Sequence, residues 1–448
     1  MKKSLAIVLA MIMMMSLLVG CGGSSSSAAD SGSSSEDAAP TNEYGLPDTD
    51  KLVIWTFVNE GENLYNWQAA NVEKYQEMYP DVEVEFVACG REVLTTFQSK
   101  LSDKDAEDFP DIIYQKDGTL APLAADGLLY SLDDAMNTKA FDQDMAWKDT
   151  FVGNFYNGMK INGVNYFVPL CMYVHGFFYD ANMFKDLGIE VPTTWDEFLA
   201  VCETLKANGI APLALDGLVD DYNDWWYIRF AERLAGVEAL DQAAAGEITF
   251  ASNPAFLQSA KYIEDLVNKG YFQEGAAGSV FPAAQALWVQ GKAGMLFCGA
   301  WIPTEMHDLR PDNMDMKMFG MPVLPDSVSD KHEEIWGNCA AITADAHNKA
   351  NAINYLKLES SMGTQASKAA TGETSPLIGA PAIPELDAME TMLTEATSVS
   401  TIYGGTAMYS EWYTSVFGPT CTKLITGVLS ADAFIAELDA ATATFYAK

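Results

Sequence analysis

The chain has few basic residues for its length. Of 448 residues, 26 are lysine or arginine and 62 are aspartate or glutamate, which gives a formal net charge of −36. An excess of negative charge on this scale repels nucleic acid and anionic lipid. The acids are dispersed along the chain, as on a solvated surface. We therefore expect no nucleic-acid partner.

Histidine is scarce, and the common catalytic motifs are missing. The four histidines do not stand at the paired spacing of a zinc site. There is no G-x-S-x-G elbow, P-loop, H-E-x-x-H motif or EF-hand loop. No metal, cofactor or catalytic residue is therefore expected. The histidines are His175, His307, His332 and His347.

No C-x-x-C pair occurs among the seven cysteines. Beyond Cys21, several lie in apolar segments, where a free thiol behaves as a small hydrophobic side chain. An even number in an exported chain permits disulfides, but no tight framework is present. We expect mostly free, buried thiols at Cys89, Cys171, Cys202, Cys298, Cys339 and Cys421.

Only one long hydrophobic run occurs, and it lies near the N-terminus. Lys2 and Lys3 precede an apolar run from Leu5 to Val19, which is short for a membrane span and typical of a secretory signal. The run ends in Leu18-Val19-Gly20-Cys21, which resembles the lipobox of bacterial lipoproteins and implies lipid on Cys21. We expect a signal peptide over 1–20 and a flexible, lipidated tether over 21–46, rich in Gly, Ser and acid. The domain would then work at the extracytoplasmic face of the cell membrane, held by its lipid anchor only.

After the tether, strand and helix patterns alternate. Three hydrophobic strand patterns alternate with helix patterns in a β-α-β-α-β series, and a third helix pattern follows; this order predicts an open, largely parallel sheet. Ligands bind outside the carboxyl ends of the strands in such sheets, which indicates Asn59-Glu60 after the first strand and Lys116-Asp117 after the third. The expected strands are 51–57, 82–87 and 111–114, and the expected helices are 64–79, 93–101 and 120–125.

A second αβ lobe is expected in the middle of the chain. Residues 160–169 read as a hairpin with Asn-Gly at its turn. A strand over 173–179 and a helix over 181–187 follow. Thr194 is a suitable N-cap for a further helix over 195–208.

Several of these segments together resemble one family. Tyr166-Phe167-Val168-Pro169, then Phe178-Tyr179-Asp180 and the segment 192–198, are similar to the first interlobe crossing of extracellular solute-binding proteins of carbohydrate ABC importers. Gly291 to Met295, followed by Gly299-Ala300-Trp301, resembles the signature G-K-A-A-M-x-x-x-G-x-W of that family. Glu333 to Thr343 resembles its second crossing, although Trp336-Gly337-Asn338 replaces the usual glycine run. The segments follow the family order over nearly the whole chain.

The resemblance implies an α/β, two-lobed, periplasmic-binding-protein-like fold of type II. Each lobe is expected to be a mostly parallel sheet flanked by helices, and hinge strands join the lobes. The expected N-terminal lobe is 47–168 with about 332–370, and the C-terminal lobe is about 169–331 with 371–448. A sugar would lie between the lobes, which close by hinge bending and deliver it to an ABC permease. Such a protein is not an enzyme, and we expect a monomer.

A sugar presents hydroxyls at its rim and apolar C–H faces, so its site needs aromatic rings and fixed carboxylates or amides. The resemblance places a stacking tryptophan at Trp301. Other candidates follow from their positions near predicted strand ends, on the crossings, or before the C-terminal helix. They are Trp225, Asp221, Trp336, Glu60, Asn59, Asp117, Tyr173, His175, Glu411 and Trp412.

Two alternatives stay open from the sequence alone. A surface glycoside hydrolase would also need aromatics and a carboxylate pair, and no pair stands out among so many acids. A receptor of the same fold for a cationic solute would also suit acidic side chains. The dense aromatics favour an oligosaccharide, because each additional sugar ring needs its own platform.

Overall fold

The computed structural model describes residues 50–401 and 408–447. All of them belong to one compact unit, Thr41–Lys448. The predicted signal peptide, Cys21 and the whole predicted tether lie outside the described residues and stay predictions. Among the described residues, no helix combines the length and apolar character needed to cross a membrane.

The first of two sheets has the strand order β2-β1-β3-β10-β4. Strand β1 is a hydrophobic run buried along almost its whole length, and it pairs in parallel with both β2 and β3. The three strands expected in this part of the chain are confirmed. The bounds are β1 (Lys51–Thr56), β2 (Glu83–Ala88), β3 (Ile112–Lys116), β4 (Phe167–Pro169) and β10 (Asn338–Ile342).

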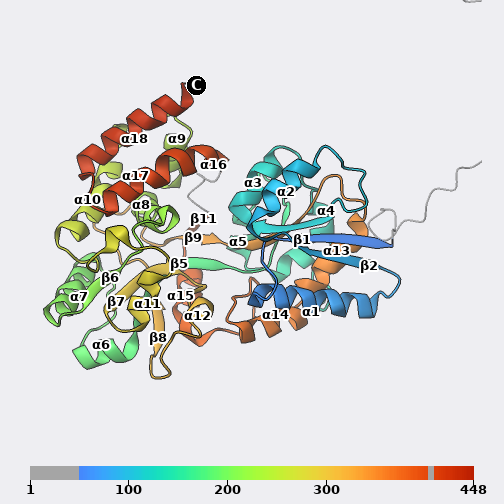
Figure 1. Cartoon of the computed structure of the whole chain (residues 1–448), viewed down its shortest axis with the longest axis horizontal. Coiled ribbons are helices and arrows are strands. Elements are labelled where there is room, and N and C mark those ends of the chain that lie inside the picture. Colours follow the sequence, from blue (N-terminus) through green and yellow to red (C-terminus); the bar gives the residue numbers. More distant parts are fainter. Residues whose placement is uncertain (1–49, 402–407, 448) are drawn as a thin grey trace, which may run out of the picture. The chain divides into compact units, whose positions relative to one another are not determined.

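Helices surround this sheet, as the alternating pattern predicts (Figure 1). Helix α1 packs against β2 and α13, and α3 packs against β3 and β10. These helices are α1 (Asn63–Met78), α2 (Val93–Lys100), α3 (Asp117–Ala125), α4 (Asp133–Met136), α5 (Gly153–Gly158), α13 (Lys349–Glu359) and α14 (Met362–Lys368).

The second sheet has the order β11-β9-β5-β7-β6, with β8 beside β5. Strand β5 pairs in antiparallel fashion with β7, β8 and β9, and every residue but its last is buried. The bounds are β5 (Tyr173–Asp180), β6 (Ala211–Ala214), β7 (Ala293–Gly299), β8 (Met316–Phe319), β9 (His332–Trp336) and β11 (Ser398–Ser400).

A larger set of helices packs around the second sheet. Helix α7 begins with the predicted Thr194 cap, completed by Glu197 as a capping box. A π-helical turn over Tyr413–Phe417 joins α16 to α17. The bounds are α6 (Ala181–Leu187), α7 (Trp195–Ala207), α8 (Asp220–Leu234), α9 (Val237–Ala244), α10 (Pro254–Asn268), α11 (Ala283–Val289), α12 (Ile302–Glu305), α15 (Asp387–Glu395), α16 (Ser410–Trp412), α17 (Gly418–Ile425) and α18 (Ala431–Tyr446).

Both sheets are mixed, whereas mostly parallel sheets were expected. The chain passes from the first sheet to the second through β4 and β5, and it returns through β9 and β10. These two crossings run in opposite directions, so β10 pairs with β4, and β9 with β5, in antiparallel fashion. The alternation of helix and strand predicts the layers, but it does not predict the direction of a returning strand.

The expected hairpin at 160–169 forms only as a turn. Asn162 and Gly163 both have positive φ, 52° and 81°, and Ile161 pairs with Val164 around them. The pairing stops there because Phe167–Pro169 forms its ladder with β10. The expectation of free thiols is confirmed for all six cysteines beyond Cys21; Cys89 is partly buried and the other five are buried.

Gly337 joins β9 to β10 where the two crossings come closest. The backbone N–H groups of Leu170 and Cys171 both donate to the carbonyl oxygen of Asn338, at 2.9 and 3.2 Å. A Cβ atom on Gly337 would lie 2.0 Å from the Cys171 carbonyl oxygen and 2.9 Å from the Phe155 ring. Because backbone cannot yield as a side chain can, this position accepts only glycine.

Gly337→Ala is therefore expected to destabilise the protein by about 1–3 kcal/mol, the usual range for overpacking. Urea denaturation monitored by circular dichroism measures the change. Gly153→Ala is the matched control, because no atom lies within 4 Å of its Cβ position. Equal stability of the two variants would contradict the close approach described for Gly337.

Candidate ligand-binding site

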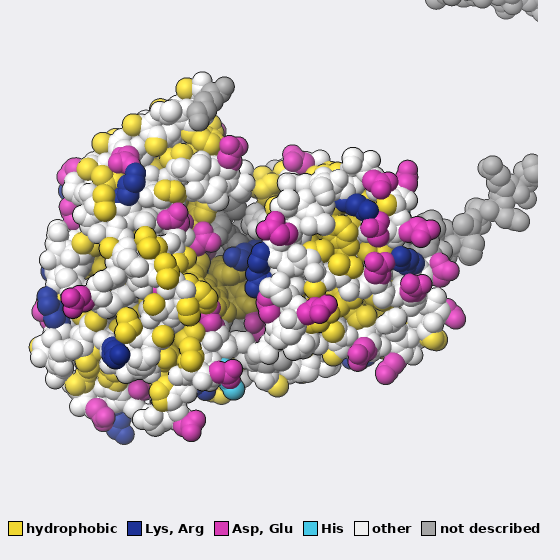
Figure 2. Space-filling model, in the orientation of Figure 1, with side chains coloured by type: hydrophobic (Ala, Val, Ile, Leu, Met, Phe, Trp, Pro, Cys, Tyr) yellow, Lys and Arg dark blue, Asp and Glu magenta, His cyan; other side chains and the backbone are white. Residues whose placement is uncertain are grey.

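A cavity of about 760 Å³ is lined by side chains from elements of both sheets. Figure 2 shows a hollow with hydrophobic side chains at its floor and basic side chains on one wall. The polar and aromatic side chains of the lining include Glu62, Arg91, Lys116, Tyr173, Asp221, Tyr222, Trp225, Trp301, Glu305, Trp336, Asn338 and Glu373.

Four rings form what we call the aromatic cluster: Tyr173, Trp225, Trp301 and Trp336. The centroid of the Trp301 ring lies 5.5 Å from that of Trp225, 5.3 Å from that of Trp336 and 5.8 Å from that of Tyr173. All three contacts are edge-to-face, a favoured arrangement of aromatic pairs. Trp301 is only partly buried, whereas the other three rings are buried. The cluster therefore presents one ring more openly than the rest.

Trp301 directly precedes α12 and follows β7 by two residues. Its ring folds back over Gly299, where a Cβ atom would lie 1.6 Å from the indole. The glycine is needed because the indole occupies the space of any side chain there. The small residues before Trp301 in the sequence thus have a direct structural reason.

Asp221 and Glu305 supply carboxylates on the same side of the cavity as Trp225 and Trp301. Asp221 is in the first turn of α8, and Glu305 ends α12. One carboxylate oxygen of Glu305, Oε2, is buried and has no hydrogen-bond partner in the protein. Burial raises the pKa of Glu305 to about 7, and the nearby Asp216 carboxylate adds to the rise. A hydrogen bond from the Trp301 side chain acts in the opposite direction and lowers the pKa. Glu305 can therefore either donate or accept a hydrogen bond near neutral pH.

The pKa of Glu305 predicts a pH-dependent difference between the protein and a Glu305→Gln variant. The pKa of this carboxyl is 4.5 in the unfolded chain and about 7 in the folded protein, so its ionisation disfavours folding. This loss of stability is absent below pH 4.5 and reaches its full size above about pH 7. The melting temperature of the variant, minus that of the parent, is expected to rise across this window. Differential scanning calorimetry of the ligand-free protein measures it, with the exposed Glu60→Gln as control. A difference that is flat with pH would contradict the assignment.

Arg91 and Glu62 form the polar wall on the side of the first sheet. Arg91 Nη2 lies 3.0 Å from Glu62 Oε2, and its Nη1 donates to the Phe57 carbonyl oxygen at 2.7 Å. Partial burial would raise the pKa of Glu62, but hydrogen bonds from Asn59 and Arg91 outweigh it and hold the pKa below its usual range. Glu62 is thus an ionised acceptor fixed at the rim.

The hydroxyl of Tyr173 is held by one group from β10 and one from the segment that follows α14. It donates a short hydrogen bond to Glu373 Oε2, and Asn338 Nδ2 donates to it at 3.4 Å. Lys116 Nζ lies 5.4 Å from the centroid of the Trp336 ring, a cation–π distance. These contacts fix the inner end of the cavity where β5, β9 and β10 meet.

Five of the sequence candidates line this one cavity: Trp301, Trp225, Trp336, Asp221 and Tyr173. Their contact with a ligand stays a prediction. They come from β5, α8, the β7–α12 junction and the end of β9.

Asn59, Glu60 and Asp117 do not line the cavity. Glu60 is exposed, and Asn59 donates from its backbone and side chain to Glu62 Oε1, at 3.0 and 2.6 Å. Asp117 is buried at the start of α3, where its Oδ1 accepts from Gly118 N at 2.9 Å. The loop after β1 turns so that Glu62, rather than Glu60, reaches the cavity.

His175 lies beneath the aromatic cluster. Its ring centroid is 4.3 Å from that of Trp225, and its Nδ1 lies 3.4 Å from Glu334 Oε2. Trp412 is fully buried and donates from Nε1 to Thr442 Oγ1 at 2.9 Å, while Glu411 is exposed on α16. None of these three side chains lines the cavity. His175 and Trp412 belong to packed interiors.

Sequence reasoning missed Arg91, Glu62, Glu305, Asn338 and Glu373 as cavity-lining side chains. The strand-end rule indicated the pair Lys116-Asp117, and Lys116 is the member that lines the cavity. Asn338 stands in the segment that departs from the glycine run, where only Trp336 was selected. No sequence signal indicates Arg91 or Glu373, which arrive through tertiary packing.

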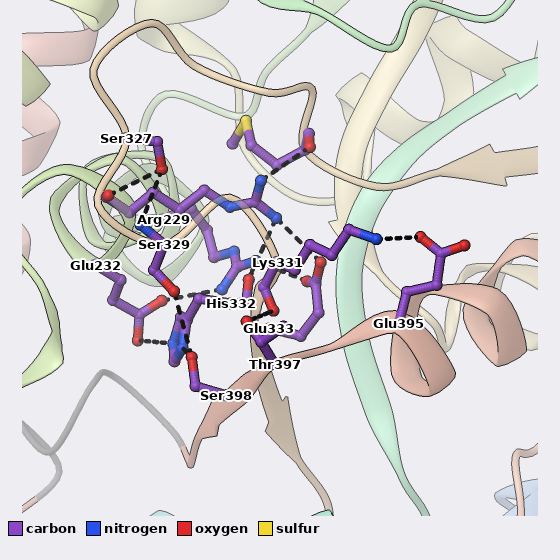
Figure 3. A network of polar contacts seen from close by, with 12 residues as sticks. Arg229, Glu232, Ser327, Ser329, Lys331, His332, Glu333, Glu395, Thr397 and Ser398 are labelled. Atoms are coloured by element: carbon purple, nitrogen blue, oxygen red, sulfur yellow. Dashed lines mark hydrogen bonds and ion pairs between the residues drawn. The ribbon is translucent and has the colours of Figure 1, made fainter.

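A buried ionic network fastens β9, which ends in Trp336, to α8, which carries Trp225 (Figure 3). Glu333 Oε2 lies 2.7 Å from Arg229 Nη2, and Glu333 Oε1 lies 3.0 Å from Arg233 Nη2. His332 Nδ1 lies 3.0 Å from the Ser398 hydroxyl of β11. The network holds the two elements that position half of the aromatic cluster. It has no groups arranged around an open cavity, and the described residues contain no cluster of side chains that could hold a metal ion.

The family model for bacterial extracellular solute-binding proteins matches residues 59–365, which is more than half of the chain. The chain therefore belongs to this family. Among solved structures, a chitin oligosaccharide binding protein is similar, with a TM-score of 0.72 and 22% identity over 89% of this chain and 99% of that chain. That likeness supports the two-lobed α/β fold of type II sugar-binding proteins.

Among curated relatives, the multiple sugar-binding protein of Streptococcus mutans is 30% identical over 165 residues. The match covers 35% of this chain and 38% of that protein. The diacetylchitobiose binding protein NgcE of Streptomyces coelicolor is 29% identical over 199 residues, covering 40% and 41%. The chain thus aligns with less than half the length of these relatives.

Proposed function

We propose that this protein captures a carbohydrate, specifically an oligosaccharide, in the cavity and delivers it to the permease of an ABC importer. The observation that carries the proposal is the aromatic cluster with carboxylates beside it. Tyr173, Trp225, Trp301 and Trp336 offer ring faces and edges for sugar C–H groups. Asp221 and Glu305 offer acceptors for hydroxyls at the same wall. The multiple sugar-binding protein and diacetylchitobiose binding protein named above support the same ligand class.

Binding is proposed to proceed without chemistry on the ligand. The lobes would close on the sugar by bending at the segments that cross between the sheets, one of which contains Gly337, and would open again at the permease. Glu62 and Arg91 on one wall, and Asp221 and Glu305 on the other, would then meet the same ligand from opposite sides. We also propose that the protein works as a monomer at the outer face of the membrane, held by lipid on Cys21.

The proposal is tested by thermal shift of the full mature chain against a panel of malto-, xylo-, chito- and raffinose-type oligosaccharides. A ligand that binds only the folded state raises the melting temperature as its concentration increases. At a ligand concentration of one hundred times Kd, the free energy of unfolding rises by about 2.7 kcal/mol. Chromatography of each sugar after overnight incubation should show the starting material only. Stabilisation by polyamines or amino acids, with none by any sugar, would overturn the carbohydrate assignment. Release of shorter sugars would favour the glycoside hydrolase instead.

A further inference from the structure

The row of aromatic rings continues past the cavity to the protein surface. The ring centroid of Tyr222, which lines the cavity, lies 4.9 Å from that of Trp225. On its other side, Tyr222 lies 6.4 Å from the ring of Phe281, in an edge-to-face contact. Phe281 does not line the cavity and is 46% exposed. Trp301, Trp225, Tyr222 and Phe281 thus form a continuous series that runs from the cavity to solvent.

Phe281 belongs to a small exposed apolar patch beside the cavity. Val280 is 54% exposed and Leu218 is 58% exposed. The backbone N–H of Leu218 donates to the Ser279 carbonyl oxygen at 3.0 Å, so the two loops that carry these side chains are joined. Contiguous apolar surface of this kind marks a contact site more often than isolated exposed side chains do.

The loop that presents Phe281 is held from below by Asp216. This carboxylate is buried, and its Oδ1 accepts hydrogen bonds from Ser279 Oγ at 2.6 Å and from Ala284 N at 3.0 Å. The next residue, Gly217, donates from N to the Ala276 carbonyl oxygen at 3.0 Å. Phe281 is therefore fixed in its exposed position before any partner arrives. A preformed platform loses little conformational entropy on binding.

We propose that Phe281 and Tyr222 form an outer stacking platform for a sugar unit that lies beyond the cavity. The proposal rests on the proposed function, and it assigns the ligand a length: an oligosaccharide whose inner units fill the cavity and whose next unit lies on Phe281. Continuity of the rings with the aromatic cluster favours a sugar chain as the occupant. A sugar chain presents an apolar C–H face at every unit. The partly exposed carboxylate of Asp221 lies in the same helical turn as Tyr222.

The test compares the parent protein with Phe281→Ala by calorimetric titration. The probes are chito- and malto-oligosaccharides from the disaccharide to the hexasaccharide. The variant is expected to bind the longer members of the bound series about five- to tenfold more weakly, with unchanged affinity for the shortest member that binds. Phe281→Trp is expected to restore the affinity. Phe141→Ala serves as control, because Phe141 is 38% exposed and does not line the cavity.

Two outcomes overturn the proposal and separate it from the proposed function. If the parent binds sugars and Phe281→Ala weakens all lengths equally, or none, the outer platform does not exist although the receptor function stands. If the parent binds no sugar of any series, both fail together. Circular dichroism and melting temperature confirm that the variant is folded in either case.

Discussion

Trp301→Ala is expected to weaken sugar binding by about 30- to 1,000-fold, the range for a central aromatic anchor of 2–4 kcal/mol. The indole contacts all three other rings of the aromatic cluster. Its loss therefore removes a stacking surface and also the ring that both Trp225 and Trp336 contact. Calorimetric titration with the tightest-binding sugar of the panel measures the change. Because Trp301 is only partly buried, the free energy of unfolding should change far less than the affinity.

Two further variants separate stacking from general damage. Gly299→Ala is expected to weaken binding too, because its methyl group would occupy the position of the indole. Trp301→Phe keeps a ring and should retain part of the affinity. An unchanged Kd for Trp301→Ala, in a protein that binds sugar, would remove this residue from the site.

Glu333→Ala is expected to destabilise the protein by about 3–5 kcal/mol, because it leaves two buried guanidinium groups without their shared partner. Arg229 and Arg233 are both about 1% exposed, and each forms an ion pair with Glu333. Chemical denaturation in urea, analysed by the midpoint and slope, measures the loss. Sugar binding should weaken as well, because Glu333 and Trp336 lie on the same strand, β9.

The matched control is Glu395→Ala. Glu395 and its partner Lys331 are both labelled in Figure 3. Glu395 pairs with Lys331 at 3.0 Å, but both side chains are more than half exposed. Water screens such a pair, so its loss should cost less than about 1 kcal/mol. Similar losses for the two variants would show that burial does not decide the strength of these contacts.

Local signals predicted the elements of the fold well. The helix at 181–187 has the expected bounds, and the helix at 195–208 ends one residue early with its expected cap. These segments carry their own information in hydrophobic period and capping side chains. Strand direction could not be predicted in the same way, since β10 owes its antiparallel pairing to a crossing that begins in the other sheet.

The candidate site was predictable where a ring or carboxylate stood near a motif, and less so elsewhere. Trp301 follows a signature, and Trp225 follows a helix start, so both could be placed near the cavity. Glu60 and Glu62 differ by two residues of loop, and only the loop geometry decides which of them reaches it. Trp412 shows the opposite limit. A tryptophan near a helix start can equally be a core residue, and its burial depends on packing against α18.

Two rings of the aromatic cluster, Tyr173 and Trp336, pair with each other as neighbouring residues of β5 and β9. They thus belong both to the strand pairing beside the crossings and to the lining of the cavity. Under the proposed function, a substitution there would alter ligand preference and the balance between open and closed forms together. Trp225, Trp301 and Phe281 do not take part in this strand pairing. We expect changes of sugar preference among descendants of this protein to accumulate at those three positions, and the pair at the crossing to change last.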